Sequence, residues 1–121
     1  RGAAFAAMCD ADARAIAAIQ ANLATTRFES RAAVLRCDWR AALPRLAALG
    51  AYYLAFLDPP YALWGGADIL GALSASGALK PGALVVCERG ARDAQPASGG
   101  MRLTDSRRWR DNAADFFRAE G

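Results

Sequence analysis

The chain has 121 residues, enough for one small domain, and 55% of them are hydrophobic, which is typical of a globular protein. No apolar run approaches the roughly 20 residues of a membrane-spanning helix, histidine is absent, and the three cysteines lack C-x-x-C spacing. Neither a zinc site nor a Ser-His-Asp triad is therefore expected, and the net charge of +3 allows a polyanionic partner without requiring one.

Apolar runs alternate with segments of helical periodicity through the first three quarters of the chain. The runs predict strands over residues 3–9, 31–37, 51–57 and 83–87. Helices are predicted between them, over residues 10–22, 39–49 and 67–75. We expect Asp10 to cap the first helix, and Pro44 to mark the start or a bend of the second.

The remaining segments predict turns and an antiparallel hairpin. The run over residues 51–57 is almost continuously apolar, as in a strand covered on both faces. Lys80-Pro81-Gly82 predicts a turn and residues 90–100 a flexible loop, because small and polar residues dominate there. Residues 101–109 and 112–119 read as two strands joined at Arg110-Asp111.

This order of elements predicts a single α/β domain over residues 1–121. Alternating strands and helices imply a mostly parallel sheet with helices on both faces, extended here by a C-terminal antiparallel hairpin.

Four acidic residues follow the predicted parallel strands: Asp10, Asp38, Asp58 and Glu88. Ligands of open α/β sheets bind beyond the carboxyl ends of the strands, where these residues are expected to lie. Asp10 could accept hydrogen bonds from ribose hydroxyls, and Asp38 from an adenine amino group. The alternative is that these acids only cap helices and form turns.

Asp58-Pro59-Pro60-Tyr61 is the most specific motif in the chain. Its two prolines stiffen a loop after a buried strand, and the Asp58 carboxylate and the Pro59 carbonyl are two acceptors for the hydrogens of an exocyclic amine. The amine is then oriented towards an electrophilic methyl group, while Tyr61 offers a ring on which an extruded base can stack. The alternative is a rigid turn with an incidental aromatic residue.

Arginines are concentrated in the last twenty residues. They predict either a solvated basic surface or contacts with phosphate. The residues concerned are Arg102, Arg107, Arg108, Arg110 and Arg118.

Together these motifs resemble the RsmD-type methyltransferases, which methylate N2 of a guanine in small-subunit ribosomal RNA. The resemblance runs almost from end to end, but only the Asp58–Tyr61 loop is specific to amino methylation. It is carried by Cys9-Asp10-Ala11-Asp12-Ala13-Arg14-Ala15, Asn22-Leu23, Cys37-Asp38, Phe56-Leu57-Asp58-Pro59-Pro60-Tyr61, Leu79 to Glu88, Arg108 to Ala113 and Phe116-Phe117-Arg118.

The resemblance implies a Rossmann-like, S-adenosylmethionine-dependent methyltransferase of the cytoplasm that acts on ribosomal RNA or the small ribosomal subunit, with no metal and no membrane association. It implies catalytic roles for Asp58, Pro59, Pro60 and Tyr61. The residues implied to bind the cofactor are Asp10, Ala11, Cys37, Asp38 and Asp58, with Cys37 standing where the family has glycine.

One part of the family pattern is not recognised in this chain: a first strand followed by a glycine-rich loop around the methionine end of the cofactor. In the family's sheet that strand lies between the strands that end here at Asp10 and Asp58. We therefore expect these two strands either to have unpaired edges or to pair with one another. We also expect the chain by itself to bind S-adenosylmethionine poorly.

Three alternatives remain open from the sequence. Related families use the same tetrapeptide to methylate adenine N6 in DNA or RNA. A non-catalytic RNA-binding remnant would be supported only by the C-terminal arginines. A nucleotide-dependent oxidoreductase would share the sheet, but its Gly-x-Gly-x-x-Gly loop is not present in the sequence.

Overall fold

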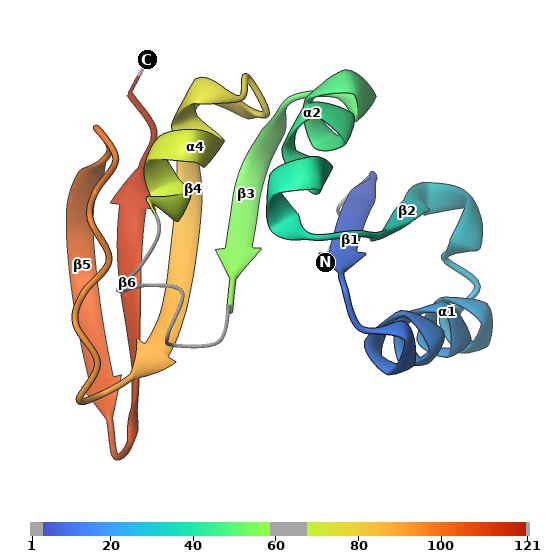
Figure 1. Ribbon diagram of the computed structural model, residues 1–121, viewed down its shortest axis with the longest axis horizontal. Coiled ribbons are helices and arrows are strands. Elements are labelled where there is room, and N and C mark those ends of the chain that lie inside the picture. The colour runs from blue at the N-terminus through green and yellow to red at the C-terminus, as the bar shows by residue number, and fades with distance from the viewer. Residues whose placement is uncertain (1–3, 59–67, 121) are drawn as a thin grey trace. The chain divides into compact units, whose positions relative to one another are not determined.

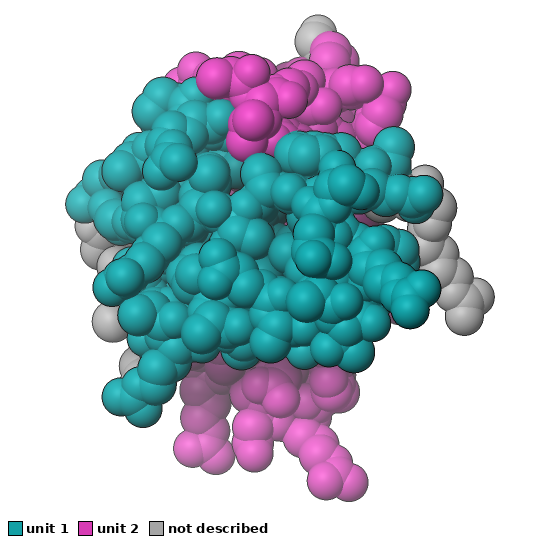
Figure 2. All heavy atoms as spheres, turned by 90° about the vertical axis from the view of Figure 1, so that its right-hand side faces the viewer, with its two compact units in different colours: residues 1–46 teal, residues 47–121 magenta. Residues whose placement is uncertain are grey.

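The fold is taken from a computed structural model, which describes residues 4–58 and 68–120. The chain forms two compact units, residues 1–46 and residues 47–121, shown in different colours in Figure 2. The boundary falls inside helix α2, which spans Trp39–Leu49. The expectation of a single domain over residues 1–121 stays a prediction.

The N-terminal unit contains two parallel strands connected by a helix (Figure 1). Strand β1 spans Ala6–Asp10, helix α1 spans Ala13–Thr26, and strand β2 spans Ala32–Arg36 after a 3-10 turn over Glu29–Arg31. The two strands pair in register over their whole length. A strand, a crossover helix and a parallel strand form the βαβ unit that the sequence predicts.

The start of helix α1 differs from the prediction. Asp12, and not Asp10, caps the helix, since its carboxylate accepts a hydrogen bond from the backbone N–H of Arg14 at 2.9 Å. Asp10 is the last residue of β1, and its carboxylate accepts from the backbone N–H of Asp12 at 2.8 Å. The sequence offers two aspartates at this turn, and the one placed two residues later meets the free N–H groups of the helix.

The C-terminal unit is built on a four-stranded sheet in the order β3-β4-β6-β5. Its elements are β3 Tyr52–Leu57, α4 Ile69–Ala75, β4 Leu79–Gly90, β5 Arg102–Trp109 and β6 Asn112–Arg118. Strands β3 and β4 are parallel, whereas β6 is antiparallel to both β4 and β5. The predicted hairpin is confirmed, and its turn lies at the same end of the sheet as the carboxyl ends of β3 and β4 (Figure 1).

The core of this unit lies between α4 and the sheet. Leu70 of the helix, Val85 of β4 and Phe117 of β6 are almost completely buried. Each such side chain contributes about 1.5–3 kcal/mol of hydrophobic free energy to folding. Among the described residues, no helix is both long enough and apolar enough to cross a bilayer.

Strand β4 is longer than the sequence predicts. The expected turn Lys80-Pro81-Gly82 lies inside it, and the pairing with β3 is irregular there, since Tyr52 is opposite Leu79 and Leu54 is opposite Leu84. Between these two pairs, four residues of β4 lie opposite the single residue Tyr53 of β3. Pro81 lacks an N–H and Gly82 has a φ of +75°, so the turn chemistry produces a bulge within a continuous strand.

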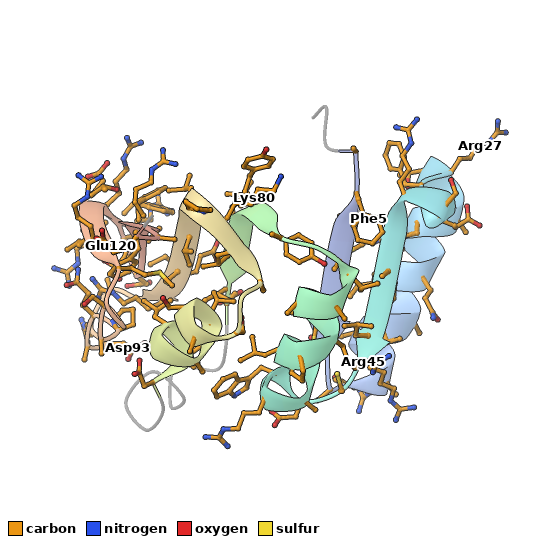
Figure 3. All side chains as sticks on the ribbon, turned by 90° about the horizontal axis from the view of Figure 1, so that it is seen from above. Phe5, Arg27, Arg45, Lys80, Asp93 and Glu120 are labelled. Atoms are coloured by element: carbon orange, nitrogen blue, oxygen red, sulfur yellow. The ribbon has the colours of Figure 1, made fainter. Side chains whose placement is uncertain are left out.

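The prediction that the third strand is covered on both faces is wrong for β3. Tyr53 and Phe56 are 72% and 71% exposed, and Leu54 is 47% exposed. Within the described residues β3 is an edge strand with one hydrogen-bonded neighbour, β4, and β1 likewise pairs with β2. The side chain of Lys80 lies over the ring of Tyr53, with Nζ 3.8 Å from the ring centroid (Figure 3). Of the two outcomes expected for β1 and β3, the described residues show the unpaired edges, since β1 pairs with β2 and β3 with β4, in separate sheets.

The segment that connects β4 and β5 is more firmly held than the predicted flexible loop. It runs along β5 back to the opposite end of the sheet (Figure 1). At its end, Gly99 approaches α4 so closely that a Cβ there would collide with the backbone of Leu70 and Gly71. Gly99 and Gly100 both have positive φ, of +59° and +85°, but a Cβ at Gly100 would meet open space.

Gly99→Ala is expected to destabilise the protein much more than Gly100→Ala. The second change carries only the left-handed backbone penalty, about 1–2 kcal/mol. The first adds the collision with α4, a further 1–3 kcal/mol or so. Urea unfolding of both variants measures the difference. Equal losses would mean that the segment does not pack on α4.

Candidate functional site

The candidate catalytic aspartate lies at the carboxyl end of a parallel strand, as predicted. Asp58 directly follows β3 and is exposed. Leu57 is paired with Cys87, so Asp58 and Glu88 each lie one residue beyond this pair on neighbouring strands. Glu88 is also exposed, but it lies within β4, two residues before the strand ends. Pro59, Pro60 and Tyr61 lie outside the described residues.

The predicted cofactor residues of the first unit lie beside the adjacent ends of β1 and β2. The backbone N–H of Cys37 donates to the carbonyl of Asp10 at 3.1 Å. In return, the thiol of Cys9 donates to the carbonyl of Cys37 at 3.3 Å. One end of the two-stranded sheet therefore brings together Asp10, Ala11, Cys37 and Asp38. The sequence predicts their proximity only from the order of the strands. The structure adds the hydrogen bonds that connect the ends of β1 and β2.

Burial raises the pKa of the Cys9 thiol to about 11, with additional contributions from Cys37 and Asp10. The thiol is therefore protonated at neutral pH and serves as a hydrogen-bond donor to the Cys37 carbonyl. Its role in this unit is to fix the backbone between β2 and α2.

Asp10 and Asp38 have the chemistry of ribose and adenine acceptors. The Asp10 carboxylate offers about four lone-pair positions, and the bond from the Asp12 N–H uses one of them. Asp38 is exposed and immediately precedes α2, where its carbonyl accepts the N–H of Ala42 at 3.0 Å. An adenosine presents hydroxyl and amino donors, so these two acids fit the nucleoside part of S-adenosylmethionine.

The structure does not bring all the predicted site residues into one unit. Asp58 and Glu88 belong to the C-terminal unit, whereas Asp10, Ala11, Cys37 and Asp38 belong to the N-terminal unit. Each group lies at the carboxyl ends of parallel strands in its own sheet. In the part of the chain that the structure describes, no cluster of three or more acidic, cysteine or histidine side chains is arranged to hold a metal ion.

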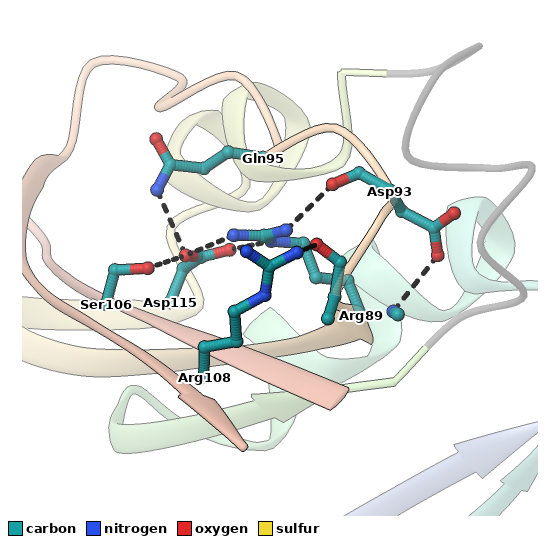
Figure 4. A network of polar contacts seen from close by, with 8 residues as sticks. Arg89, Asp93, Gln95, Ser106, Arg108 and Asp115 are labelled. Carbon is teal, nitrogen blue, oxygen red and sulfur yellow. Dashed lines mark hydrogen bonds and ion pairs between the residues drawn. The ribbon is translucent and has the colours of Figure 1, made fainter. Parts of the chain in front are cut away.

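Sequence reasoning missed a buried polar network centred on Asp115 (Figure 4). Asp115 is completely buried, and its carboxylate accepts hydrogen bonds from Arg89 at 2.6 and 3.3 Å, from Ser106 at 2.6 Å and from Gln95 at 3.0 Å. These partners come from β4, β5 and the connecting segment. The signal in the sequence is weak: an aspartate stands between Ala114 and Phe116 in an otherwise apolar strand.

Asp115 is ionised despite its burial. Burial pushes the pKa of this carboxyl up, but the hydrogen bonds from Arg89, Ser106 and Gln95 outweigh it, and the pKa lies below its ordinary value. In turn, the hydrogen bond to Asp115 raises the pKa of Arg89. Burial, with Asp115 as a smaller cause, raises the pKa of the neighbouring Cys87 thiol to about 12. The network therefore holds an ion pair and a neutral thiol.

The network is linked to Asp58 through the pairing of the four strands. Leu57 pairs with Cys87, Cys87 with Asp115, and Asp115 with Ser106, which forms one row across all four strands. Asp58 follows the first residue of this row. The ion pair thus fixes the carboxyl end of β4 and the connecting segment at the same end of the sheet as Asp58.

Comparison with known proteins identifies the family of the chain. The family model described as conserved hypothetical protein 95 matches residues 1–118. No curated protein matches the chain.

Several solved structures share the fold. A conserved hypothetical protein from Streptococcus pyogenes has a TM-score of 0.85 and 26% identity, covering 97% of this chain and 72% of its own. The candidate methyltransferase yhhF from Escherichia coli has a TM-score of 0.78 and 23% identity, covering 98% and 66%. The rRNA methyltransferase aviRa from Streptomyces viridochromogenes has a TM-score of 0.55 and 20% identity, covering 84% and 47%.

These matches agree with the element order and with the motifs that run almost the whole length of the chain. The strands β1 to β4 with their parallel pairs, followed by the antiparallel strands β5 and β6, have the Rossmann-like arrangement of methyltransferases. The chain belongs to the family of conserved hypothetical protein 95, the RsmD family that its motifs resemble.

Proposed function

We propose that the protein transfers a methyl group from S-adenosylmethionine to the exocyclic N2 amine of a guanine in small-subunit ribosomal RNA. The observation that carries the proposal is Asp58, followed in sequence by Pro59-Pro60-Tyr61 and exposed at the carboxyl end of parallel strand β3. The family match and the names of the solved relatives, one of them an rRNA methyltransferase, support it.

The chemistry follows from the acceptors in this loop. The Asp58 carboxylate and the Pro59 carbonyl each accept one hydrogen of the exocyclic amine, which fixes the direction of the nitrogen lone pair. As the bond from nitrogen to the methyl carbon forms, the bond from that carbon to the donor sulfur breaks and a neutral thioether leaves. The Asp58 carboxylate stabilises the positive charge on the nitrogen until the nitrogen loses one proton to water. Tyr61 stacks on the target base and keeps that base extruded from the RNA helix.

S-Adenosylmethionine supplies an electrophilic methyl group, and residues of the N-terminal unit suit its nucleoside. Asp10 accepts from the ribose hydroxyls and Asp38 from the adenine amine, while Ala11 and Cys37 contribute backbone groups at the adjoining strand ends. In this proposal residues of the N-terminal unit would hold the nucleoside of the methyl donor, weakly in this chain by itself, and Asp58 would orient the amine that accepts the methyl group.

Methyl transfer to defined acceptors tests the proposal. The purified protein is incubated with small-subunit ribosomal RNA or with duplex DNA, and the products are digested to nucleosides. Methyl-labelled S-adenosylmethionine is supplied at a concentration high enough to saturate the weak binding expected of the chain. We expect label in N2-methylguanosine from RNA. Label in N6-methyladenosine would assign the adenine-directed activity instead. RNA binding without transfer would favour a binding remnant.

A further inference from the structure

An open hollow of about 450 Å³ lies at the turn of the β5–β6 hairpin, at the carboxyl end of β4. Three arginines line it: Arg92 from the segment after β4, Arg108 from β5, and Arg110 from the hairpin turn. Two aspartates, Asp93 and Asp111, also line it, so the charged side chains leave an excess of one positive charge. The remaining lining comes from the backbone at Gly90 and Ala91.

Hydrogen bonds fix the walls of this hollow (Figure 4). Arg108 donates to the carbonyl of Ala91 at 2.6 Å. The backbone N–H of Ala91 donates to the carbonyl of Asp111 at 2.7 Å. Arg89, held by Asp115, donates to the carbonyl of Asp93 at 2.7 Å. The connecting segment and the hairpin turn are thereby joined, and Arg92 and Arg110 extend from anchored backbone.

One of the two acids is already engaged within the wall of the hollow. The Asp93 carboxylate accepts from the N–H of Gly90 at 3.0 Å, which partly satisfies its charge within the wall. Arg108 uses one of its five N–H donors on Ala91 and keeps a planar fork that matches a phosphate. Arg92 and Arg110 are exposed.

The hollow lies at the same end of the sheet as Asp58. Arg108 of β5 pairs with Ala113 of β6, which in turn pairs with Arg89 of β4. Arg89 lies two residues beyond Cys87, the residue of β4 that pairs with Leu57 of β3. Asp58 and Arg108 are therefore at the same end of the sheet, three strands apart. At about 4.8 Å per strand the separation across the sheet is roughly 14 Å, which a few nucleotides of a single strand can bridge.

We propose that this hollow binds backbone phosphate of the RNA substrate, a few nucleotides from the base that Asp58 holds. The proposal rests on the proposed function for its choice of RNA. It selects Arg108 and Arg110 from the C-terminal arginines and adds Arg92 from the segment after β4. Forked guanidinium groups on a fixed wall provide charge-assisted, bidentate phosphate contacts.

Arg92→Gln/Arg110→Gln tests the proposal, with Arg27→Gln/Arg31→Gln as the control. The control pair is exposed, lies in the N-terminal unit and removes the same charge. Binding of transcribed small-subunit ribosomal RNA is measured between 0.1 and 1 M salt. Loss of two phosphate contacts should make the slope of log affinity against log salt shallower by about 1.4. The loss of affinity relative to the wild type is then about 25-fold larger at 0.1 M than at 1 M salt. The control is expected to retain the wild-type slope.

Methyl transfer separates this proposal from the proposed function. With activity present, the hollow variant should raise the KM for RNA and leave kcat at saturating RNA nearly unchanged. Equal loss of RNA affinity in both variants would overturn the proposal, as would a larger loss for duplex DNA than for RNA. If no RNA is methylated, the proposed function fails, while the salt slopes still decide whether the hollow binds RNA.

Discussion

Asp58→Ala is expected to lower methyl transfer by about 100- to 1,000-fold while leaving the fold intact. The carboxylate is exposed at the end of β3, so its removal opens no cavity. What is lost is one of the two acceptors that orient the amine and the charge that stabilises the developing cation, and loss of one such electrostatic partner typically costs this much in kcat. Single-turnover transfer to RNA, with saturating cofactor, measures the effect.

Asp58→Asn separates orientation from charge. The asparagine amide keeps a carbonyl acceptor of the same length but carries no negative charge. We therefore expect intermediate activity, with kcat lowered and the KM for RNA nearly unchanged. Glu120→Ala removes another exposed acid and should behave as the wild type. Full activity of Asp58→Ala would contradict the assignment of the loop, and a lowered melting temperature would show that Asp58 supports the fold.

The order of the elements could be predicted from the sequence because the local signals agree with the final structure. Apolar runs mark β2 and β3 within one or two residues, and the hairpin joined at Arg110-Asp111 is predicted with similar accuracy. Helix α2 has the predicted bounds, Trp39–Leu49, and it continues through Pro44. The strand-end positions of Asp10, Asp38 and Asp58 follow from the same periodicity.

The features that were missed depend on contacts between residues distant in sequence. The Arg89–Asp115 pair joins residues 26 positions apart, and no local pattern indicates that an aspartate in β6 meets an arginine in β4. The bulge at Lys80-Pro81-Gly82 depends on the pairing of β4 with Tyr52 and Leu54. The exposure of Phe56 depends on which strand lies at the sheet edge, and apolar composition does not reveal this.

Asp115→Ala is expected to be the most destabilising single change in the C-terminal unit. It leaves the Arg89 guanidinium, itself largely buried at 12% side-chain exposure, without its carboxylate. Removing one partner of a buried ion pair typically costs about 3–5 kcal/mol, a large part of the 5–15 kcal/mol or so that stabilises a domain. Urea unfolding at pH 7 measures the loss. Asp105→Asn, which breaks an exposed pair with Arg107, is the control and should change little.

The pH dependence gives this prediction a second readout. The hydrogen bonds from Arg89, Ser106 and Gln95 outweigh the opposing effect of burial, so the folded-state pKa of Asp115 lies below the unfolded value of 3.8. A lowered folded-state pKa means that the unfolded chain binds the proton more readily. The stabilisation is therefore present above about pH 4 and is lost as the pH falls through the folded-state pKa.

The difference in unfolding free energy between the wild type and Asp115→Asn should accordingly be constant from pH 7 to about pH 5 and shrink at lower pH. A difference that stays constant in acid would mean that Asp115 acts through packing alone. Arg89→Met/Asp115→Leu removes both charges and fills similar volume, and it should recover much of the stability lost in Asp115→Ala. Recovery of stability with weakened RNA binding would show that the ion pair positions the segment carrying Arg92 as well as stabilising the sheet.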